Sequence, residues 1–154
     1  AGVSTFVAAQ ASFELLLREQ VEGMPPQLLE VESWRVIVDA RGDGTAVAEA
    51  TVKVVAGGER LVAVGEGNGP VNALDQALRS ALAPAYAGLA KLELIDYRVR
   101  IVEAAHGTDA VTRVLIETTD GQTSWSTVGV HPNIIEASWE ALVDSVTYGL
   151  LRDR

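Results

Sequence analysis

The strongest constraint on the fold of this chain is an internal repeat. When the sequence is shifted by 64 positions against itself, identical residues coincide at predicted turns, strands and helix starts. Chance matches among so many alanine and valine residues are the alternative, but turns, third strand and helix start share this one offset. The sequence therefore predicts that one structural unit occurs twice. The coinciding pairs are Ile37 and Ile101, Val38 and Val102, Ala46 and Ala110, Val47 and Val111, Gly57 and Gly121, Val64 and Val128, Gly65 and Gly129, Ala73 and Ala137, Ala77 and Ala141, and Leu78 and Leu142.

Each unit is predicted to consist of three strands followed by one helix. Apolar residues alternate with polar ones in the strands and recur three and four positions apart in the helices, while Gly-Gly and Asp-Gly mark hairpin turns. Asn133 and Glu136 have the spacing of a capping box at the second helix start. The predicted strands are Trp34–Asp39, Ala46–Ala56 and Arg60–Gly65, then Glu93–Glu103, Ala110–Thr119 and Gln122–Val130, with helices from Pro70 and from about Asn133 to Leu150.

A further helix is predicted over residues 3–22, where Gly23 and the Pro25-Pro26 pair end it. We therefore expect an α+β fold of two βββα units related by pseudo-two-fold symmetry and preceded by this helix. The expected boundaries are 1–26 for a linker helix and 27–154 for the domain, with repeats at about 33–90 and 93–154. The apolar stripe of the first helix consists of Phe6, Val7, Phe13, Leu16 and Leu17.

Charge and composition argue against several kinds of partner. Twelve Lys and Arg against 21 Asp and Glu give a formal net charge of −9, so neither nucleic acid nor an anionic membrane is expected. No apolar run approaches the roughly 18 residues of a membrane span. The lack of cysteine favours a reducing compartment, and we expect a cytoplasmic protein. Because the chain starts without Met and without the basic segment of a signal peptide, we expect it to be processed or cut from a longer protein.

No arrangement of residues typical of a catalytic site is recognisable. Two histidines, His106 and His131, are too few for a three-histidine metal site, and His106 is predicted to lie in a turn. The Gly65–Pro70 segment is not a phosphate loop, because no lysine follows and Glu66 would repel phosphate. Its glycines and the N–H groups of the following helix suit one carboxylate. A tight turn that caps the helix is the alternative.

Several motifs, in order along the chain, resemble one known family. The segment Gly67–Leu78 resembles the Gly-Asn-Gly-Pro motif of the C-terminal regulatory domain shared by 2-isopropylmalate synthase and citramalate synthase. Leu94–Val99 is similar to the opening of that family's second repeat. Three further segments resemble the citramalate synthase branch of the family: Trp125–Val130, Asn133–Leu142 and Ala11–Leu16. The resemblance covers nearly the whole chain.

The resemblance implies a duplicated βββα regulatory domain that forms a homodimer and binds a branched-chain amino acid. The implied effector is isoleucine in citramalate synthase and leucine in 2-isopropylmalate synthase, and isoleucine is favoured here. A purely structural dimerisation module is a further alternative. The full enzyme is implied to condense acetyl-CoA with a 2-oxo acid, pyruvate for citramalate, in a catalytic barrel that binds a divalent metal. We expect that barrel to be a partner of this chain, and the metal and acetyl-CoA to belong to it.

The family's effector site carries over onto particular residues of this sequence. The resemblance implies one loop at the first helix start, pocket residues on the first two strands of the second repeat, and a second loop nearby. We expect N–H groups of the first loop to receive the effector carboxylate and Asp96 to receive its ammonium group. His131 stands where the family more often has a small polar residue. The implied residues are Gly67, Asn68, Gly69, Pro70 and Val71, then Leu94, Tyr97, Ala110 and Thr112, and then His131, Pro132, Asn133 and Ile134.

Overall fold

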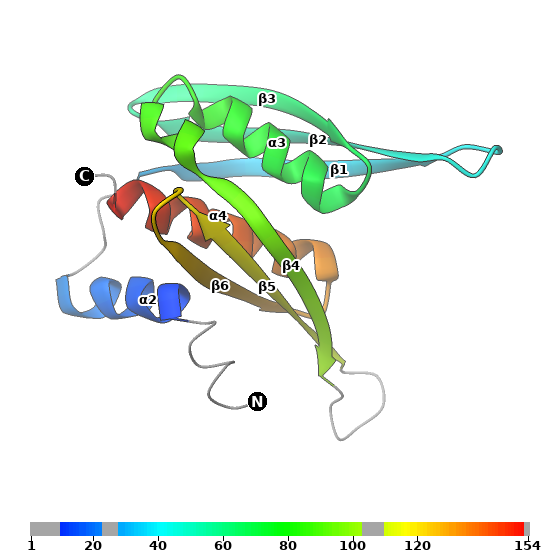
Figure 1. The fold of residues 1–154 in the computed structure, drawn as a ribbon. Coiled ribbons are helices and arrows are strands. Elements are labelled where there is room, and N and C mark those ends of the chain that lie inside the picture. The colour runs from blue at the N-terminus through cyan, green and yellow to red at the C-terminus, as the bar shows by residue number, and fades with distance from the viewer. Residues whose placement is uncertain (1–9, 23–27, 103–109, 153–154) are drawn as a thin grey trace. The chain divides into compact units, whose positions relative to one another are not determined.

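The computed structural model describes residues 10–22, 28–102 and 110–152. The chain divides into two compact units, residues 26–89 and residues 1–25 with 90–154. Each unit contains a three-stranded antiparallel sheet with one helix after the third strand (Figure 1). This confirms the predicted α+β fold of two βββα repeats. The N-terminal helix α2 (Gln10–Glu22) belongs to the unit that holds the second repeat.

Sheet A, in the unit of residues 26–89, has the strand order β1-β2-β3. Alternate residues of β2 are buried on the face that α3 covers. The β2–β3 turn uses Gly57 and Gly58 at φ +60 and +79, the left-handed region that glycine favours, so the predicted hairpin turn is confirmed. The elements are β1 (Glu30–Ala40), β2 (Ala46–Ala56), β3 (Glu59–Gly67) and α3 (Pro70–Leu82), followed by the 3₁₀ helix η1 (Ala87–Lys91).

Sheet B, in the other unit, has the strand order β4-β5-β6, and α4 packs against β5 and β6. Buried polar groups of the sheet find partners on α4. Trp125 Nε1 donates to the carbonyl oxygen of Ser145 at 3.1 Å, and Thr127 Oγ1 donates to that of Ala141 at 2.7 Å. The elements are β4 (Glu93–Val102), β5 (Val111–Thr119), β6 (Ser124–His131) and α4 (Ile134–Arg152).

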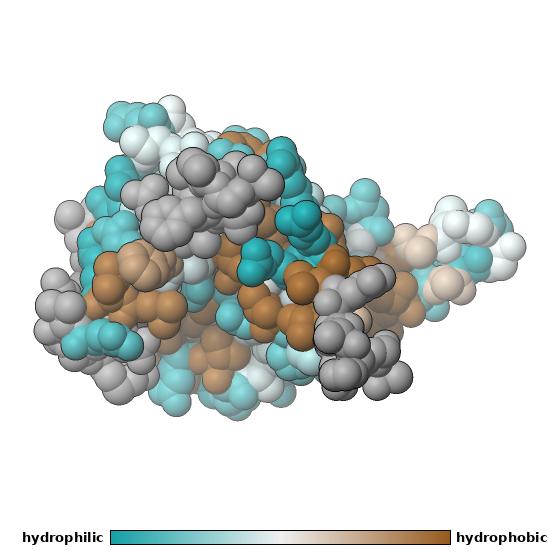
Figure 2. Space-filling model, turned by 90° about the horizontal axis from the view of Figure 1, so that it is seen from below, coloured by the Kyte–Doolittle hydropathy of each residue, from teal (hydrophilic) through white to brown (hydrophobic). Residues whose placement is uncertain are grey.

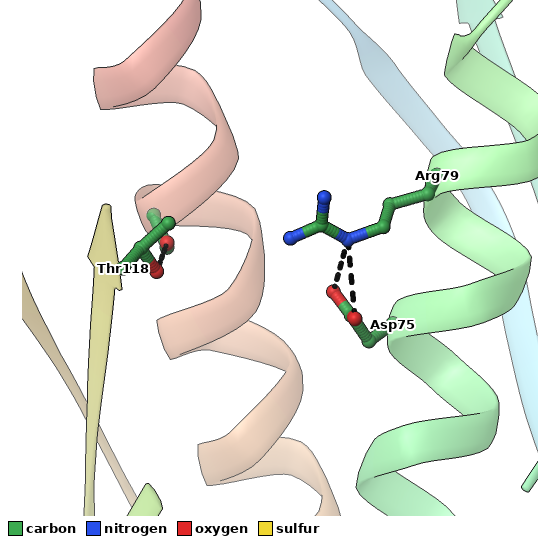
Figure 3. Close-up of polar contacts among 4 residues, drawn as sticks. Asp75, Arg79 and Thr118 are labelled. Atoms are coloured by element: carbon green, nitrogen blue, oxygen red, sulfur yellow. Dashed lines mark hydrogen bonds and ion pairs between the residues drawn. The ribbon is translucent and has the colours of Figure 1, made fainter. Parts of the chain in front are cut away.

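Further polar contacts lie inside each unit (Figure 3). On α3, Arg79 Nε donates to both carboxylate oxygens of Asp75 one turn earlier, at 3.0 and 3.1 Å. In the other unit, the buried hydroxyls of Thr118 on β5 and Ser145 on α4 are hydrogen-bonded to each other. Buried polar atoms that are paired in this way avoid the cost of lost hydration.

The duplication is clearest where each helix crosses its own sheet. A Cβ added at Gly65 would lie 2.5 Å from the carbonyl oxygen of Ala73, and one added at Gly129 would lie 1.8 Å from that of Ala137. Both pairs are related by the predicted offset of 64. Each glycine therefore lets a helix backbone approach the third strand, and both repeats use the same close contact.

One part of the predicted alignment is wrong. Glu49 pairs with Ile37, whereas Arg113, its counterpart at the offset of 64, pairs with Arg100 and not with Ile101. The first strands therefore correspond at an offset of 63, and the second repeat has one more residue between the equivalent paired positions of its first two strands. The matches of Ile37 with Ile101 and of Val38 with Val102 are coincidences of sequence. By the same register, Trp34 is the counterpart of Tyr97.

The N-terminal helix is confirmed over its described part, α2, while Phe6 and Val7 of the predicted stripe lie outside the described residues. Ser12 faces the rest of the unit: its Oγ accepts a hydrogen bond from the N–H of Val128 on the edge strand β6 at 3.0 Å. The apolar side chains of Leu16 and Leu17 are exposed. Apolar periodicity thus identifies the helix, but the face that contacts β6 and α4 is a different one.

Candidate functional site

The loop expected at the first helix start is shorter than predicted. Glu66 and Gly67 still belong to β3, so only Asn68 and Gly69 separate the strand from α3, which begins at Pro70. A Cβ at Gly67 would lie 2.8 Å from Cβ of Asn72 and 2.9 Å from the backbone nitrogen of Ala73. Glycine at this position therefore permits the tight passage from strand to helix.

The start of α3 carries no side-chain cap among the described residues. Its N-cap is Gly69, in extended backbone at φ −158 and ψ 167. The side chain of Asn68 accepts a hydrogen bond from Asn72 Nδ2 at 2.5 Å rather than from the backbone. Helix geometry leaves the first N–H groups without intrahelical partners. The N–H groups of Val71 and Asn72 thus form a partially positive helix end that no side chain of the described residues caps.

The start of α4 is built differently. Asn133 Oδ1 accepts hydrogen bonds from the N–H groups of Ile135 at 2.8 Å and Glu136 at 3.2 Å, so Asn133 is the N-cap. The predicted reciprocal bond from Glu136 to the N–H of Asn133 is not formed. His131 Nδ1 accepts that N–H at 2.9 Å, and His131 Nε2 lies 2.6 Å from Glu136 Oε2. His131 therefore closes the cap, in the tautomer that carries its proton on Nε2.

We expect Asn133→Ala to destabilise the second unit by about 1 kcal/mol, because two helix N–H groups lose their acceptor. Urea unfolding measures the change. Asn68→Ala is the matched control, since the Asn68 side chain bonds only another exposed side chain. Equal stability of the two variants would contradict the capping role of Asn133.

Four of the predicted pocket residues share the face of sheet B that α4 covers. Tyr97 is paired with the buried Ile116, and Thr112 is paired with both Ile101 and His131. Residues paired across an antiparallel sheet lie on the same face, so Tyr97, Thr112 and His131 share this face of sheet B. Leu94 lies on this face as well, opposite the buried Thr118.

The hydroxyl of Tyr97 reaches α4. It lies 3.0 Å from Ser138 Oγ, which itself donates to the carbonyl oxygen of Ile134 at 2.7 Å. Because the Ser138 proton is used in that bond, Tyr97 is the donor to Ser138. Ile134, at the first position of α4, keeps its side chain exposed. Tyr97 thus ties β4 to the first turns of α4.

Two of the predicted site residues lie elsewhere. Asp96 is paired with Glu117, on the sheet face opposite to Tyr97. Its carboxylate accepts hydrogen bonds from the backbone N–H of Tyr97 at 2.9 Å and from Arg98 Nε at 2.8 Å. Ala110 is exposed and precedes β5, which begins one residue later than predicted. The structure therefore does not bring Asp96 onto the face that holds Leu94, Tyr97 and Thr112.

The second unit also contains a pocket of about 330 Å³ that the sequence did not indicate. Arg152 lines this pocket and contacts two other lining residues. Its Nη2 donates to Thr123 Oγ1 at 3.1 Å, and its guanidinium carbon lies 5.8 Å from the centre of the Tyr148 ring. No residue of the predicted effector site lines this pocket. The lining residues are Ala11, Glu117, Thr123, Ser124, Trp125, Ser126, Tyr148 and Arg152.

Two classes of feature are absent from the described part of the chain. No group of three or more His, Asp or Glu side chains there could hold a metal ion. No helix in the described ranges is long and apolar enough to cross a membrane. The predicted turn at His106 lies outside these ranges.

Comparisons with known proteins agree with the motifs. Residues 7–150 match the LeuA allosteric (dimerisation) domain. The (R)-citramalate synthase of Streptomyces coelicolor is 62% identical over 148 residues, which cover 96% of this chain and 28% of that protein. The (R)-citramalate synthase of Aquifex aeolicus is 46% identical over 149 residues, with the same coverage of 96% and 28%. The 2-isopropylmalate synthase of Parafrankia sp. is 34% identical over 98 residues, 64% of this chain and 16% of that protein.

The chain spans 28% of the length of these two citramalate synthases. The matched residues 7–150 include α2, both sheets and nearly all of α4. The duplicated βββα fold, the order of the motifs and this match lead to one family. The chain belongs to the family of LeuA allosteric (dimerisation) domains.

Proposed function

We propose that this chain is the feedback-regulatory part of a citramalate synthase-like acyltransferase, which condenses acetyl-CoA with pyruvate. In this role the chain forms a homodimer and binds isoleucine. The 62% identity to an (R)-citramalate synthase supports this choice. Leucine is the alternative effector, because a 2-isopropylmalate synthase is also similar. The divalent metal and acetyl-CoA belong to the catalytic barrel of the proposed parent enzyme.

The observation that carries the proposal is the difference between the two helix starts. Asn133 and His131 satisfy the N–H groups at the start of α4. The start of α3 has only Gly69 as its N-cap and no side-chain cap among the described residues. A carboxylate placed there gains the hydrogen bonds of free N–H groups and the favourable helix dipole. We propose that the effector carboxylate binds at Asn68–Val71.

The other contacts of the effector stay predictions. The resemblance implies Leu94, Tyr97, Ala110, Thr112, His131, Asn133 and Ile134 as further residues of the effector site. The proposal omits Asp96 as the ammonium partner, because its carboxylate already accepts hydrogen bonds from Tyr97 and Arg98 on the opposite face of sheet B.

We expect Gly69→Asp to weaken effector binding while the protein stays folded. The backbone of Gly69 is extended, and a Cβ there meets nothing within 4 Å, so aspartate fits. Its carboxylate caps the N–H groups of α3 and stabilises the helix by a few tenths of a kcal/mol. The same carboxylate competes with and repels that of the effector, which lowers the affinity about ten-fold or more. Calorimetric titration with L-isoleucine measures the affinity.

Gly69→Ala is the matched control, because it adds a Cβ without an acceptor and should keep most of the affinity. Gly69→Asp binding as tightly as the wild type would place the carboxylate elsewhere. A parallel titration of the wild type with L-leucine tests the effector: two isomers that differ only in branching should be separated by about 1–3 kcal/mol. Preference for leucine would move the parent to 2-isopropylmalate synthase, and binding of neither would leave a structural dimerisation module.

A further inference from the structure

One dipeptide at the surface, Asn68-Gly69, has a chemical reactivity that the proposed function does not use. Apolar and hydrophilic residues are interspersed over the surface, as the brown and teal areas of Figure 2 show for one side of the molecule. Exposed valine, glutamate or arginine side chains do not react with their own backbone. An asparagine followed by glycine does, because the glycine nitrogen attacks the side-chain carbonyl carbon and no Cβ hinders it. Asn68 is exposed and directly follows β3.

The other two asparagines of the chain are less suited to this reaction. Asn72 is followed by Ala73, whose N–H is held in a helix hydrogen bond to the carbonyl oxygen of Gly69 at 3.1 Å. Asn133 is followed by Ile134, whose β-branched side chain crowds its own backbone nitrogen. The Gly69 N–H, in contrast, has no acceptor among the described residues. The reaction is therefore directed to the asparagine that precedes Gly69.

The two Asp-Gly pairs of the chain could form the same ring, but their carboxylates are held in the ionised form. Hydrogen bonds from Thr45 lower the pKa of Asp43. Hydrogen bonds from the N–H groups of Thr123 and Gln122 lower the pKa of Asp120. An ionised carboxylate resists attack by a nitrogen atom, whereas the amide of an asparagine is neutral. These two turns are therefore protected, and the Asn-Gly pair is not.

We propose that Asn68 deamidates spontaneously and that the product lowers the affinity of the effector site. The Gly69 nitrogen forms a bond to Cγ of Asn68, the bond from Cγ to Nδ2 breaks, and the proton of the Gly69 nitrogen leaves with Nδ2 as ammonia. Water then opens the resulting succinimide ring at either carbonyl group, which produces aspartate or isoaspartate. Asn72 Nδ2 donates a hydrogen bond to Asn68 Oδ1 at 2.5 Å, which favours the attack because this oxygen becomes negative during it.

Both products place a negative charge beside the start of α3, where the proposed effector carboxylate binds. The partial positive charge of this helix end attracts the new carboxylate, which then repels the effector, so we expect the affinity to fall about ten-fold or more. Isoaspartate also lengthens the main chain by a carbon atom where only Asn68 and Gly69 connect β3 to α3. The modification itself rests on the Asn-Gly pair, while its effect on binding rests on the proposed function.

Mass spectrometry of the wild type aged in mildly alkaline buffer tests the modification. Samples are digested at mildly acid pH, where ring closure is slow. The peptide that contains Asn68 should gain the mass of an amide-to-acid conversion, and the peptide that contains Asn133 should not. Gly69→Ala should keep most of its Asn68 amide over the same period, because the added Cβ shields the attacking nitrogen. Conversion of Asn68 no faster than that of Asn133, or equally fast in Gly69→Ala, overturns the proposal.

Calorimetric titration with L-isoleucine tests the effect on binding. Anion exchange first separates the modified chains, which carry an additional negative charge. They should bind about ten-fold more weakly or worse than fresh protein, and Asn68→Asp should reproduce the loss. Aged and fresh Gly69→Ala should bind equally well. Equal affinity of modified and unmodified chains overturns the effect on binding. Fresh wild type that binds neither isoleucine nor leucine overturns the proposed function and this effect with it, while the mass spectra still decide the modification.

Discussion

Gly129→Ala is expected to unfold or severely destabilise the second unit. The added Cβ would lie 1.8 Å from the carbonyl oxygen of Ala137 and 3.1 Å from the backbone nitrogen of Ala141. Both contacts are with the helix backbone, so no change of rotamer can relieve them, and α4 must move away from β6. Overpacking of a core costs 1–3 kcal/mol or more, and we expect about 3 kcal/mol or more here. Urea unfolding followed by far-ultraviolet circular dichroism measures the loss.

The control for this prediction is Gly42→Ala. Gly42 lies in the exposed β1–β2 turn, where a Cβ meets nothing within 4 Å. The free energy of unfolding of the Gly42→Ala variant should therefore change little. The equivalent Gly65→Ala should damage the first unit in the same way, since its Cβ would lie 2.4 Å from the backbone nitrogen of Ala77. A Gly129→Ala protein as stable as Gly42→Ala would mean that α4 does not lie against β6 at this distance.

These glycines explain why so much of the fold could be predicted. Gly65 and Gly129 coincide at the offset of 64 because both repeats need the same close contact between helix and strand. The hairpin turn at Gly57 and Gly58 is visible in the sequence for a similar reason, since positive φ favours glycine. Steric requirements of this kind leave one residue type at one position, and a single sequence displays them.

Pairing between strands is far less visible. The matches of Ile37 with Ile101 and of Val38 with Val102 supported an offset of 64 in the first strands, yet the register gives 63. Isoleucine and valine suit either face of a strand, so neither pair fixes the register. The extra residue lies between the paired positions of these two strands, and the alternation of apolar and polar residues does not reveal it. The same limit applies to Asp96, whose place on the opposite face follows from the register around Ile95.

The candidate site was predicted unevenly for similar reasons. Asn133 was expected as a cap because residue type and spacing suffice to indicate one. The role of His131 in this cap was not predicted, because it depends on where the backbone N–H of Asn133 and the carboxylate of Glu136 lie in space. The burial of Asp144 was not predicted either, because its environment is created by the packing of α2 beside α4.

Asp144→Asn is expected to stabilise the fold at neutral pH. Burial raises the pKa of Asp144 to about 6, and the nearby carboxylate of Glu140, one turn earlier on α4, contributes repulsion. The folded pKa lies above the ordinary 3.8, so the folded state holds this proton more strongly than the unfolded chain does. Stability from this group is therefore present in acid and is lost as the pH rises from about 4 to about 6. The pKa difference corresponds to about 3 kcal/mol.

The measurement is urea unfolding of wild type and Asp144→Asn over a series of pH values. The amide oxygen of asparagine can still accept the hydrogen bond that Ser12 Oγ donates to Asp144 at 3.3 Å. The two proteins should differ little near pH 4, and the variant should gain an advantage of up to about 3 kcal/mol above about pH 6. Glu140→Gln should produce a smaller gain of the same sign, because it removes only the repulsion.

A pH-independent difference between the two proteins would show that Asp144 is hydrated, and hence that α2 does not cover it. That outcome would also call into question the other contacts of α2. In these, Ser12 accepts a hydrogen bond from the edge strand β6, and Glu14 accepts one from the hydroxyl of Tyr148 at 2.9 Å. The expected result instead means that docking of α2 buries a carboxylate that resists ionisation. In that case the contact between α2 and α4 is less stable at neutral pH than in acid, and Asp144→Asn makes it more stable at neutral pH.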